Sequence, residues 1–113
     1  MTDPLRGEIW LMEFDPTRGR EQAGRRPALV VSRDPFNRSA AGLVVVVPLT
    51  SKEKGIPYHV VIDAPQGGLR TRSFAKCEDL RSVSKARFVE RWGKVGSATL
   101  DEVGLRLRLL LDL

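Results

Sequence analysis

The order of apolar and polar positions along the chain predicts a protein built mainly of β-strands. Alternating or short apolar segments bounded by turn residues predict strands at 6–14, 28–31, 42–50, 58–62, 72–77, 80–83 and 88–95. The four valines at 44–47 favour a strand that is buried on both faces and is therefore central. Pro48 indicates an edge or a bulge, so we expect residues 49–51 to leave the sheet. The first strand is apolar on both sides, which predicts that it is covered or pairs with another subunit.

The end of the chain changes to helical periodicity. Leucines and a valine recur at helical spacing over 100–111, and Thr99 followed by Glu102 fits a capping box at the start of a helix. Leu105 and Leu109 add apolar surface on another side of this helix, which indicates either a dimer contact or deeper burial. We therefore expect a small antiparallel β-barrel with one C-terminal helix, forming a single domain over the whole chain.

Composition limits the domain count and suggests a class of partner. With 113 residues, of which 42% are apolar, the chain is long enough for one core and too short for two comfortable domains. The net charge is +5, and arginine outnumbers lysine by 14 to 5. Because guanidinium groups match phosphate oxygens in pairs, this balance favours a polyanionic partner. A biased base composition of the gene would produce the same arginine excess, so the charge gives only modest support for a polyanionic partner.

Cysteine and histidine are too rare for two common kinds of site. The single cysteine, Cys77, cannot form an internal disulfide. The single histidine, His59, is expected on a strand surface, and no Cys/His cluster has zinc-binding spacing. No apolar run is long enough to span a membrane, and the N-terminus lacks a signal-peptide pattern. We expect a soluble, cytoplasmic protein that needs neither a metal nor a cofactor.

The junction at residues 21–32 is the first candidate for a functional site. A polar loop of roughly a dozen residues runs into an apolar strand there, and loops of that length often bind ligands. Pro27 restricts Arg26 to extended backbone angles, so Arg26 is expected at the strand entrance or edge. Thr50 is expected at the mouth of another strand. Taken singly, each of these residues fits an ordinary structural role.

The combined motifs resemble those of the MazF/PemK (Kid) growth-arrest toxins. The matching segments are Gly7-Glu8-Ile9-Trp10, Asp15-Pro16-Thr17, Glu21-Gln22-Ala23-Gly24, Arg26-Pro27-Ala28-Leu29-Val30-Val31-Ser32, Phe36-Asn37 and Val47-Pro48-Leu49-Thr50-Ser51. They occur in order and in register over the first half of the chain. Weaker similarity continues through Gly67-Gly68-Leu69 and Cys77-Glu78 to the closing helix, so the resemblance spans nearly the whole chain.

The resemblance implies a fold, an activity and partners. It implies a homodimeric, SH3-like (CcdB/PemK-like) barrel that cleaves single-stranded RNA at short sequences. It also implies inhibition by a MazE-like antitoxin with an acidic C-terminal segment. By position, the key arginine of the family falls on Arg26 and its key threonine on Thr50, with Glu21 in a loop that closes over the site. An Arg-Cys-Asp run of the Kid branch falls on Lys76-Cys77-Glu78, so the roles of Lys76 and Glu78 are less defined.

Such a cleavage requires only a few groups. Attack of the RNA 2′-hydroxyl on the adjacent phosphate needs alignment, a proton acceptor, a proton donor and charge stabilisation. Arg26 would hold the phosphate, Thr50 would donate a hydrogen bond to a phosphoryl oxygen, and Glu21 or Glu78 would accept the proton. Further contacts to RNA are expected from Arg18, Arg20, Gln22, Arg25, Ser51, Lys52, Lys54 and Lys76.

Two other functions remain open at this stage. One is a non-catalytic inhibitor like the CcdB toxins, which share the fold and bind DNA gyrase; the pairing of Arg26 with Thr50 argues against it. The other is a basic barrel that only binds nucleic acid. Digestion of RNA by purified protein in EDTA would distinguish the enzyme from both alternatives. RNA binding without cleavage, with an affinity whose log–log dependence on salt has a slope near ~0.7 per neutralised phosphate, would favour the binding barrel.

Overall fold

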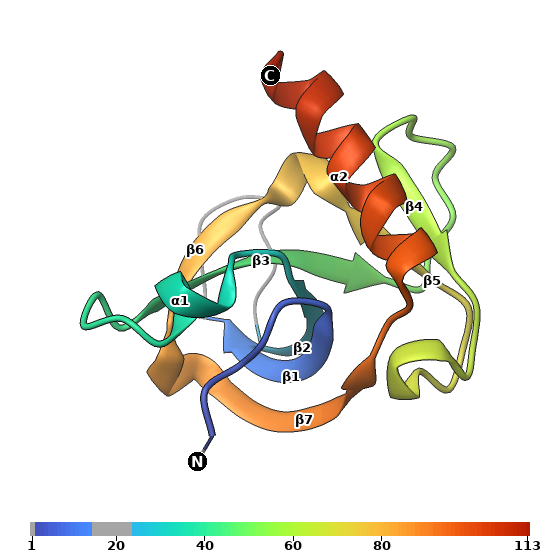
Figure 1. The fold of residues 1–113 in the computed structure, drawn as a ribbon. Helices are drawn as coiled ribbons and strands as arrows, with labels where there is room; N and C mark the ends of the chain where they lie inside the picture. The colour runs from blue at the N-terminus through green and yellow to red at the C-terminus, as the bar shows by residue number, and fades with distance from the viewer. Residues whose placement is uncertain (1, 15–23) are drawn as a thin grey trace.

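Strands dominate the structure, a computed structural model that describes residues 2–14 and 24–113 (Figure 1). Within these residues the strands are β1 (Glu8–Phe14), β2 (Gly24–Val30), β3 (Leu43–Thr50), β4 (His59–Ile62), β5 (Ser73–Lys76), β6 (Arg81–Ser84) and β7 (Phe88–Lys94). The helices are α1 (Asp34–Asn37), α2 (Ser97–Leu111) and the 3₁₀ turns η1 (Gln66–Gly68), η2 (Cys77–Asp79) and η3 (Lys85–Arg87). The predicted mainly-β fold with a C-terminal helix is confirmed, whereas α1 was not predicted.

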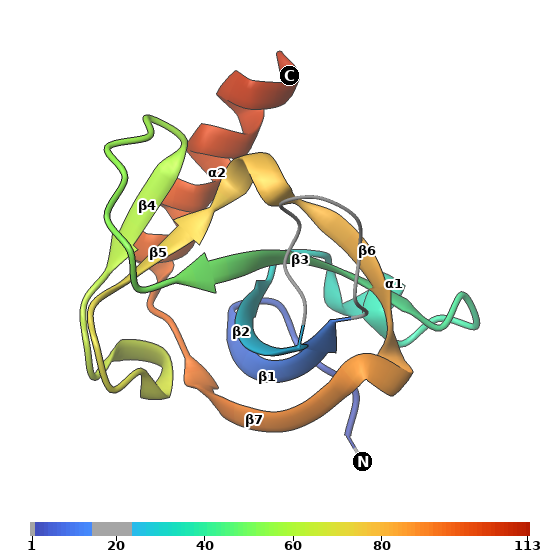
Figure 2. The same ribbon diagram turned by 180° about the vertical axis from the view of Figure 1, so that it is seen from behind.

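The strands form an antiparallel sheet that curves around the core. Their order is β4-β5-β3-β2-β1-β7, and β6 pairs with another part of β3. Both views show β1, β2 and β7 bending around one side while β3 crosses the molecule and ends beside β5 (Figure 2). Among the described residues β4 and β7, the two ends of this order, do not pair with each other. The prediction of a barrel therefore holds for the curvature of the sheet but not for its closure.

Strand β3 is central, as predicted, and it changes partners along its length. Its residues 43–46 pair with β6 on one side, and its residues 46–48 pair with β2 on the other. Its last two residues, Leu49 and Thr50, pair with Ala75 and Phe74 of β5. The prediction that residues 49–51 leave the sheet is therefore wrong for the first two of them. Because proline has no backbone N–H, Pro48 lies where the ladder with β2 ends and the ladder with β5 begins.

Strands β1 and β3 and the second half of β2 are buried on both faces. Ile9, Leu29 and Val47 belong to one apolar cluster, whereas Trp10 and Val46 belong to a second. Since successive side chains of a strand point to opposite faces, one run of apolar residues serves both clusters. Burial of each large aliphatic side chain contributes about 1.5–3 kcal/mol relative to its exposure. The expectation that the first strand is covered is confirmed, and the cover comes from this chain.

Helix α2 begins earlier than the sequence predicts and is capped differently. Its N-cap is Gly96, which has no side-chain cap, so the predicted capping box at Thr99 is wrong. Thr99 instead lies in the first turn, where its hydroxyl donates to Oε1 of Gln66 at 2.6 Å. The backbone N–H of Gly96 donates to the same oxygen at 3.0 Å. The side chain of Gln66 on η1 thus satisfies donors at the helix start.

The outer end of α2 projects beyond the sheet (Figures 1 and 2). Val103 is buried on the inner face, whereas Leu105 and Leu109 are 47% and 62% exposed. The alternative of deeper burial for these two leucines is therefore wrong within this chain. In the described part of the structure, no helix has the length and apolarity needed to cross a membrane.

Candidate functional site

Arg26 and Thr50 approach each other where two neighbouring strands end. Strand β2 pairs with β1 along its length but with β3 only from Ala28 onward, and Ala28 lies opposite Pro48. Counting two residues outward from that pair places Arg26 across from Thr50 on the same face, because side chains alternate with a period of two. Pro27 lies outside the ladder with β3, so its missing N–H leaves no gap there. The expected position of Arg26 at the start of a strand is confirmed.

Both residues line a hollow that we call the Arg26–Thr50 pocket. Its walls are Arg26, Pro27, Leu49, Thr50, Ser51, Lys52, Leu69, Arg70, Thr71, Ser73 and Trp92, and they enclose about 220 Å³. The lining contains three cationic side chains, four hydroxyl groups and no carboxylate. Since pockets for drug-sized ligands span about 300–1,000 Å³, this one suits a single phosphate or base of a longer chain.

The cations of the pocket are not neutralised by neighbouring acids. Arg26, Lys52 and Arg70 are exposed, and none forms an ion pair with a residue in the described part of the chain. Arg25 differs, because its Nε lies 3.1 Å from Oε2 of Glu13 on β1. Of the two adjacent arginines, only Arg25 pairs with an acid of the described residues, so the charge of Arg26 in the pocket lining stays unpaired. Such a site attracts phosphate oxygens.

Thr50 is oriented by the backbone that follows it. Its Oγ1 accepts a hydrogen bond from the backbone N–H of Lys52 at 3.2 Å, in the turn after β3. A hydroxyl that already accepts one hydrogen bond keeps its own hydrogen for donation. The half-buried Thr50 can therefore donate to an oxygen held in the pocket.

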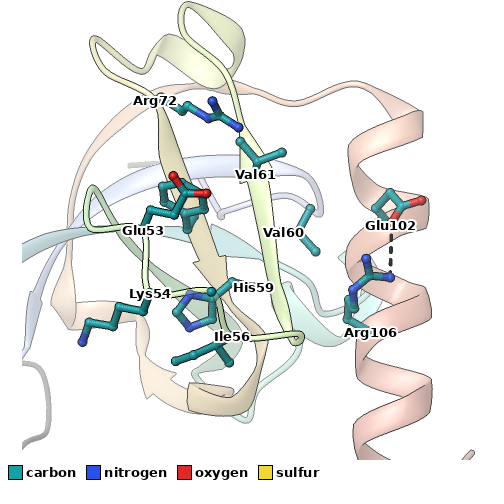
Figure 3. Close-up of a pocket in the computed structure, with 11 residues that line it drawn as sticks. Glu53, Lys54, Ile56, His59, Val60, Val61, Arg72, Glu102 and Arg106 are labelled. Carbon is teal, nitrogen blue, oxygen red and sulfur yellow. Dashed lines mark ion pairs between the residues drawn. The ribbon is translucent and has the colours of Figure 1, made fainter.

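Glu78 and Lys76 lie outside the Arg26–Thr50 pocket. Oε2 of Glu78 is 2.8 Å from Nε2 of His59, and Nζ of Lys76 is 3.7 Å from Oδ2 of Asp79. The side chain of His59 is only 4% exposed, so its prediction as a surface residue is wrong. His59 pairs with Lys76 across the ladder between β4 and β5, and the preceding segment at 54–56 lies against it (Figure 3). Glu78 and Arg26 are thus not brought into one pocket.

The cysteine between Lys76 and Glu78 is chemically inactive in the folded chain. Cys77 is fully buried in an apolar cluster. This burial, with a smaller effect from the negative charge of Glu78, raises the pKa of its thiol to about 11. The thiol is therefore protonated near neutral pH and is a poor nucleophile. Among the described residues no group of three His, Cys, Asp or Glu side chains is arranged to hold a metal ion.

A second hollow lies beside the edge strand β4 and has a different character (Figure 3). It encloses about 370 Å³, and its lining includes Lys54, Glu53 and His59 together with residues of α2. Both signs of charge are present, and Arg106 is 3.4 Å from Glu102 across one turn of the helix. Lys54, one of the expected RNA contacts, thus faces this hollow rather than the Arg26–Thr50 pocket.

The remaining candidates divide into three groups. Ser51 and Lys52 line the Arg26–Thr50 pocket, whereas Arg25 pairs with Glu13. The candidates Arg18, Arg20, Glu21 and Gln22 lie outside the described residues. Seven pocket residues were not among the candidates, and four of these have polar or aromatic side chains: Arg70, Thr71, Ser73 and Trp92. These four residues come from the segment before β5, from the start of β5 and from β7, all far from Arg26 in sequence. The only local signal near them is the Gly67-Gly68 pair, which is typical of a turn or a close backbone approach.

Comparison with known proteins relates the whole chain to one family. The family model for PemK-like, MazF-like toxins of type II toxin-antitoxin systems matches residues 5–111. The endoribonuclease MazF9 of Mycobacterium tuberculosis is 40% identical, and the alignment covers 96% of each chain. A crystal structure of MazF from Deinococcus radiodurans matches with a TM-score of 0.87 and 32% identity over 100% of both chains. A MazE–MazF structure from the same organism matches with a TM-score of 0.80 and 32% identity over 99% of both chains.

Proposed function

The chain belongs to the PemK-like, MazF-like toxins of type II toxin-antitoxin systems, and we propose that it is a metal-independent endoribonuclease. It cleaves single-stranded RNA at short sequences in the cytoplasm, and the loss of mRNA arrests translation and growth. The related proteins MazF9 of M. tuberculosis and PemK of Escherichia coli are endoribonucleases. The RNA sequence that is cut depends on loop contacts, and mapping the cut sites on a long RNA identifies it.

One observation carries this proposal: an unpaired arginine and a threonine hydroxyl line one small pocket. Arg26 forms no ion pair with a described residue, and Thr50 has a hydroxyl hydrogen to donate. A guanidinium with no carboxylate beside it is available to a phosphate, which it binds through two parallel hydrogen bonds. No acid in the pocket lining repels that phosphate.

The proposed reaction uses the RNA as its own nucleophile. The 2′-hydroxyl oxygen forms a bond to the adjacent phosphorus while the bond from phosphorus to the 5′-oxygen of the next nucleotide breaks. This leaves a cyclic phosphate and a 5′-oxygen that takes a proton from water to become a hydroxyl. Arg26 stabilises the charge that develops on the phosphoryl oxygens, and Thr50 donates a hydrogen bond to one of them. A carboxylate takes the 2′-hydroxyl proton, and Glu21 and Glu78 are the two candidates. Cleavage rates of Glu21→Gln and Glu78→Gln decide between them.

The test is a cleavage assay of purified protein on a long mixed-sequence RNA in EDTA. We expect wild-type protein to cut at a small set of sites, and a substrate with a 2′-deoxy nucleotide at a mapped site to resist cutting there. Arg26→Ala and Thr50→Ala should each lower the rate on the order of a hundredfold or more while the protein stays folded. Arg38→Ala is the matched control, because Arg38 is exposed and lines a different hollow near the N-terminus. Wild-type rates for both pocket variants would disprove the site assignment.

We also propose two partners. A second copy of this chain would cover apolar surface such as Leu105 and Leu109 on α2, and an antitoxin related to MazE would bring an acidic segment to the cationic pocket. To test the second copy, we measure sedimentation. We expect wild type to sediment as a dimer and the double variant Leu105→Glu and Leu109→Glu to sediment as a folded monomer. An acidic reading frame immediately upstream of the gene would support the antitoxin.

A further inference from the structure

Trp92 presents an indole ring at the edge of the Arg26–Thr50 pocket. It lies on β7 and is half-buried, with part of its surface packed against the apolar cluster that contains Leu69. Trp92 is also one of the residues that line the pocket. Its indole N–H donates to Oε1 of Glu90 at 2.9 Å, so the polar atom of the ring is satisfied by the protein itself. The ring is therefore held in place and offers a ligand apolar surface rather than a hydrogen bond.

Glycines fix the backbone that carries this ring. At Gly68, with φ of +77°, an added Cβ would lie 2.3 Å from the carbonyl oxygen of Trp92. At Gly93, an added Cβ would lie 2.7 Å from the carbonyl carbon of Gly67. Only residues without a side chain allow η1 and β7 to approach this closely. Contact between these two backbones places Trp92 next to the segment that carries Leu69 and Arg70.

Arg70 is the second guanidinium group in the lining of this pocket, beside that of Arg26. It is exposed and forms no ion pair with the described part of the chain. Together with Trp92 it lines both the Arg26–Thr50 pocket and a neighbouring open hollow whose other walls are Gly68, Glu90 and Arg91. Arg70 and Trp92 thus lie between the pocket and the hollow, and a polymeric ligand that occupies both must pass over these two residues.

We propose that Trp92 is a stacking platform for the base next to the scissile phosphate and that Arg70 binds the phosphate of that neighbouring nucleotide. This assignment rests on the proposed endoribonuclease function, which it extends by naming residues that position the RNA. Every base has an aromatic face, so stacking on an indole tolerates different bases and positions the strand without reading its sequence. Arg70 neutralises the next phosphate along and sets the direction in which the strand leaves Arg26.

The charge and the ring together favour RNA over an acidic peptide at this position. Carboxylate side chains of a peptide would also pair with Arg26 and Arg70, but they offer no flat ring to stack on Trp92. A single strand supplies one base for each phosphate, which matches the arrangement of one indole beside two guanidinium groups. An acidic peptide that occupied the Trp92 surface in preference to RNA would overturn the proposal.

The experiment measures binding of a single-stranded RNA oligonucleotide with one 2′-deoxy nucleotide, placed at a mapped cut site or, where wild type cuts no RNA, at the centre of a mixed-sequence strand. Because this ligand cannot be cleaved, binding is measured even if the proposed activity fails. Trp10, the other tryptophan, is buried in the core, so a change in intrinsic fluorescence on binding reports on Trp92. We expect binding to change the wild-type fluorescence and the Trp92→Phe variant to bind nearly as tightly as wild type.

Trp92→Ala should weaken binding about 5- to 150-fold, the range reported by alanine substitution for one stacked base. A ligand with an abasic nucleotide beside the cut should bind wild type more weakly, and the Trp92→Ala variant should not distinguish it from the intact ligand. Arg70→Gln should lower the log–log salt slope of binding by about 0.7, whereas the control Arg38→Gln should leave it unchanged.

The inference and the proposed function fail separately. If wild type cleaves RNA but Trp92→Ala binds and cuts as wild type does, the stacking platform is disproved and the endoribonuclease function stands. If wild type binds the uncleavable RNA with the expected response of Trp92 but cuts no RNA, the activity is disproved and the binding surface stands. A fluorescence change produced by a poly-glutamate peptide and not by RNA would disprove the proposed ligand.

Discussion

Nε2 of His59 lies 2.8 Å from Oε2 of Glu78 and joins the edge strand β4 to η2. The His59 ring is 4% exposed, whereas the Glu78 side chain is 31% exposed, so a buried ring holds a carboxylate that reaches solvent. Nδ1 of His59 is buried, and no hydrogen-bond partner for it is present among the described residues. A proton on Nε2 fits this pair, because a carboxylate oxygen accepts hydrogen bonds.

Replacement of this histidine should change the chemistry more than the stability. In His59→Leu the carboxylate of Glu78 loses its fixed orientation. If Glu78 rather than Glu21 takes the 2′-hydroxyl proton, we expect kcat for RNA cleavage to fall on the order of tenfold with little change in KM; if Glu21 takes it, kcat should not change. Leucine also removes the unsatisfied Nδ1, so the melting temperature should not fall markedly. His59→Gln keeps an N–H donor and should recover part of the rate. In a Glu78→Ala background, His59→Leu should have no further effect; an additive effect would contradict this coupling.

The close contact between η1 and β7 predicts a large effect of a very small substitution. Gly68→Ala places a methyl group against the carbonyl of Trp92 and also strains a residue with positive φ. We expect the free energy of unfolding to fall by at least about 2–3 kcal/mol, measured by urea denaturation. Gly55→Ala is the matched control, since Gly55 has φ of +66° with nothing within 4 Å of an added Cβ. It carries the strain alone, and an equal loss in both variants would contradict the role of the contact.

The surroundings of Glu8 predict how the stability of the fold depends on pH. Burial alone would raise the pKa of this carboxyl, but hydrogen bonds from Trp10, Leu5 and Arg91 and the charge of Arg91 outweigh it and lower the pKa below 4.5. Nε of Arg91 lies 2.5 Å from Oε2 of Glu8, and the indole N–H of Trp10 lies 2.9 Å from Oε1. The stabilisation is therefore complete above pH 4.5 and is lost as the pH falls through the lower folded value.

Glu8→Gln should remove that pH dependence. At pH 7 we expect the free energy of unfolding to fall by about 1–3 kcal/mol, the usual contribution of hydrogen bonds to a charged group. Below pH 4 the difference from wild type should shrink. Glu13→Gln serves as the comparison, because the pair of Glu13 with Arg25 is largely exposed and should contribute less than about 1 kcal/mol. Denaturation curves at several pH values measure both variants.

Cys77 should resist thiol reagents while the protein is folded. With a pKa of about 11, roughly one thiol in a thousand is ionised at pH 8, and the side chain is also buried. We expect modification by a disulfide reagent to be slow in native protein and fast in guanidinium chloride. Because the thiol ionises more easily in the unfolded chain, the free energy of unfolding is highest below pH 9.0 with respect to this group. It falls as the pH rises from 9.0 toward 11. Rapid labelling of native protein at pH 8 would show that Cys77 is accessible.

Local sequence determined most of the secondary structure. Runs of β-branched residues such as 44–47 and turn residues between them specify strands because both act within a few residues of backbone. Arg26 and Thr50 were identifiable for a related reason: each stands next to a proline-containing strand segment in a motif shared with a known family. Their location in one pocket follows from the register of β2 and β3.

Only the tertiary structure determined which distant residues meet. Thr99 looked like a helix cap, but Gln66, 33 residues earlier in the chain, satisfies the donors of the helix start. His59 looked exposed because a four-residue strand carries no information about what covers it. Arg70 and Trp92 carry no local pattern that links them to Arg26. Contacts between residues far apart in sequence depend on how the whole chain packs, so the free charge of the pocket and the ring beside it were decided by the fold rather than by any one segment.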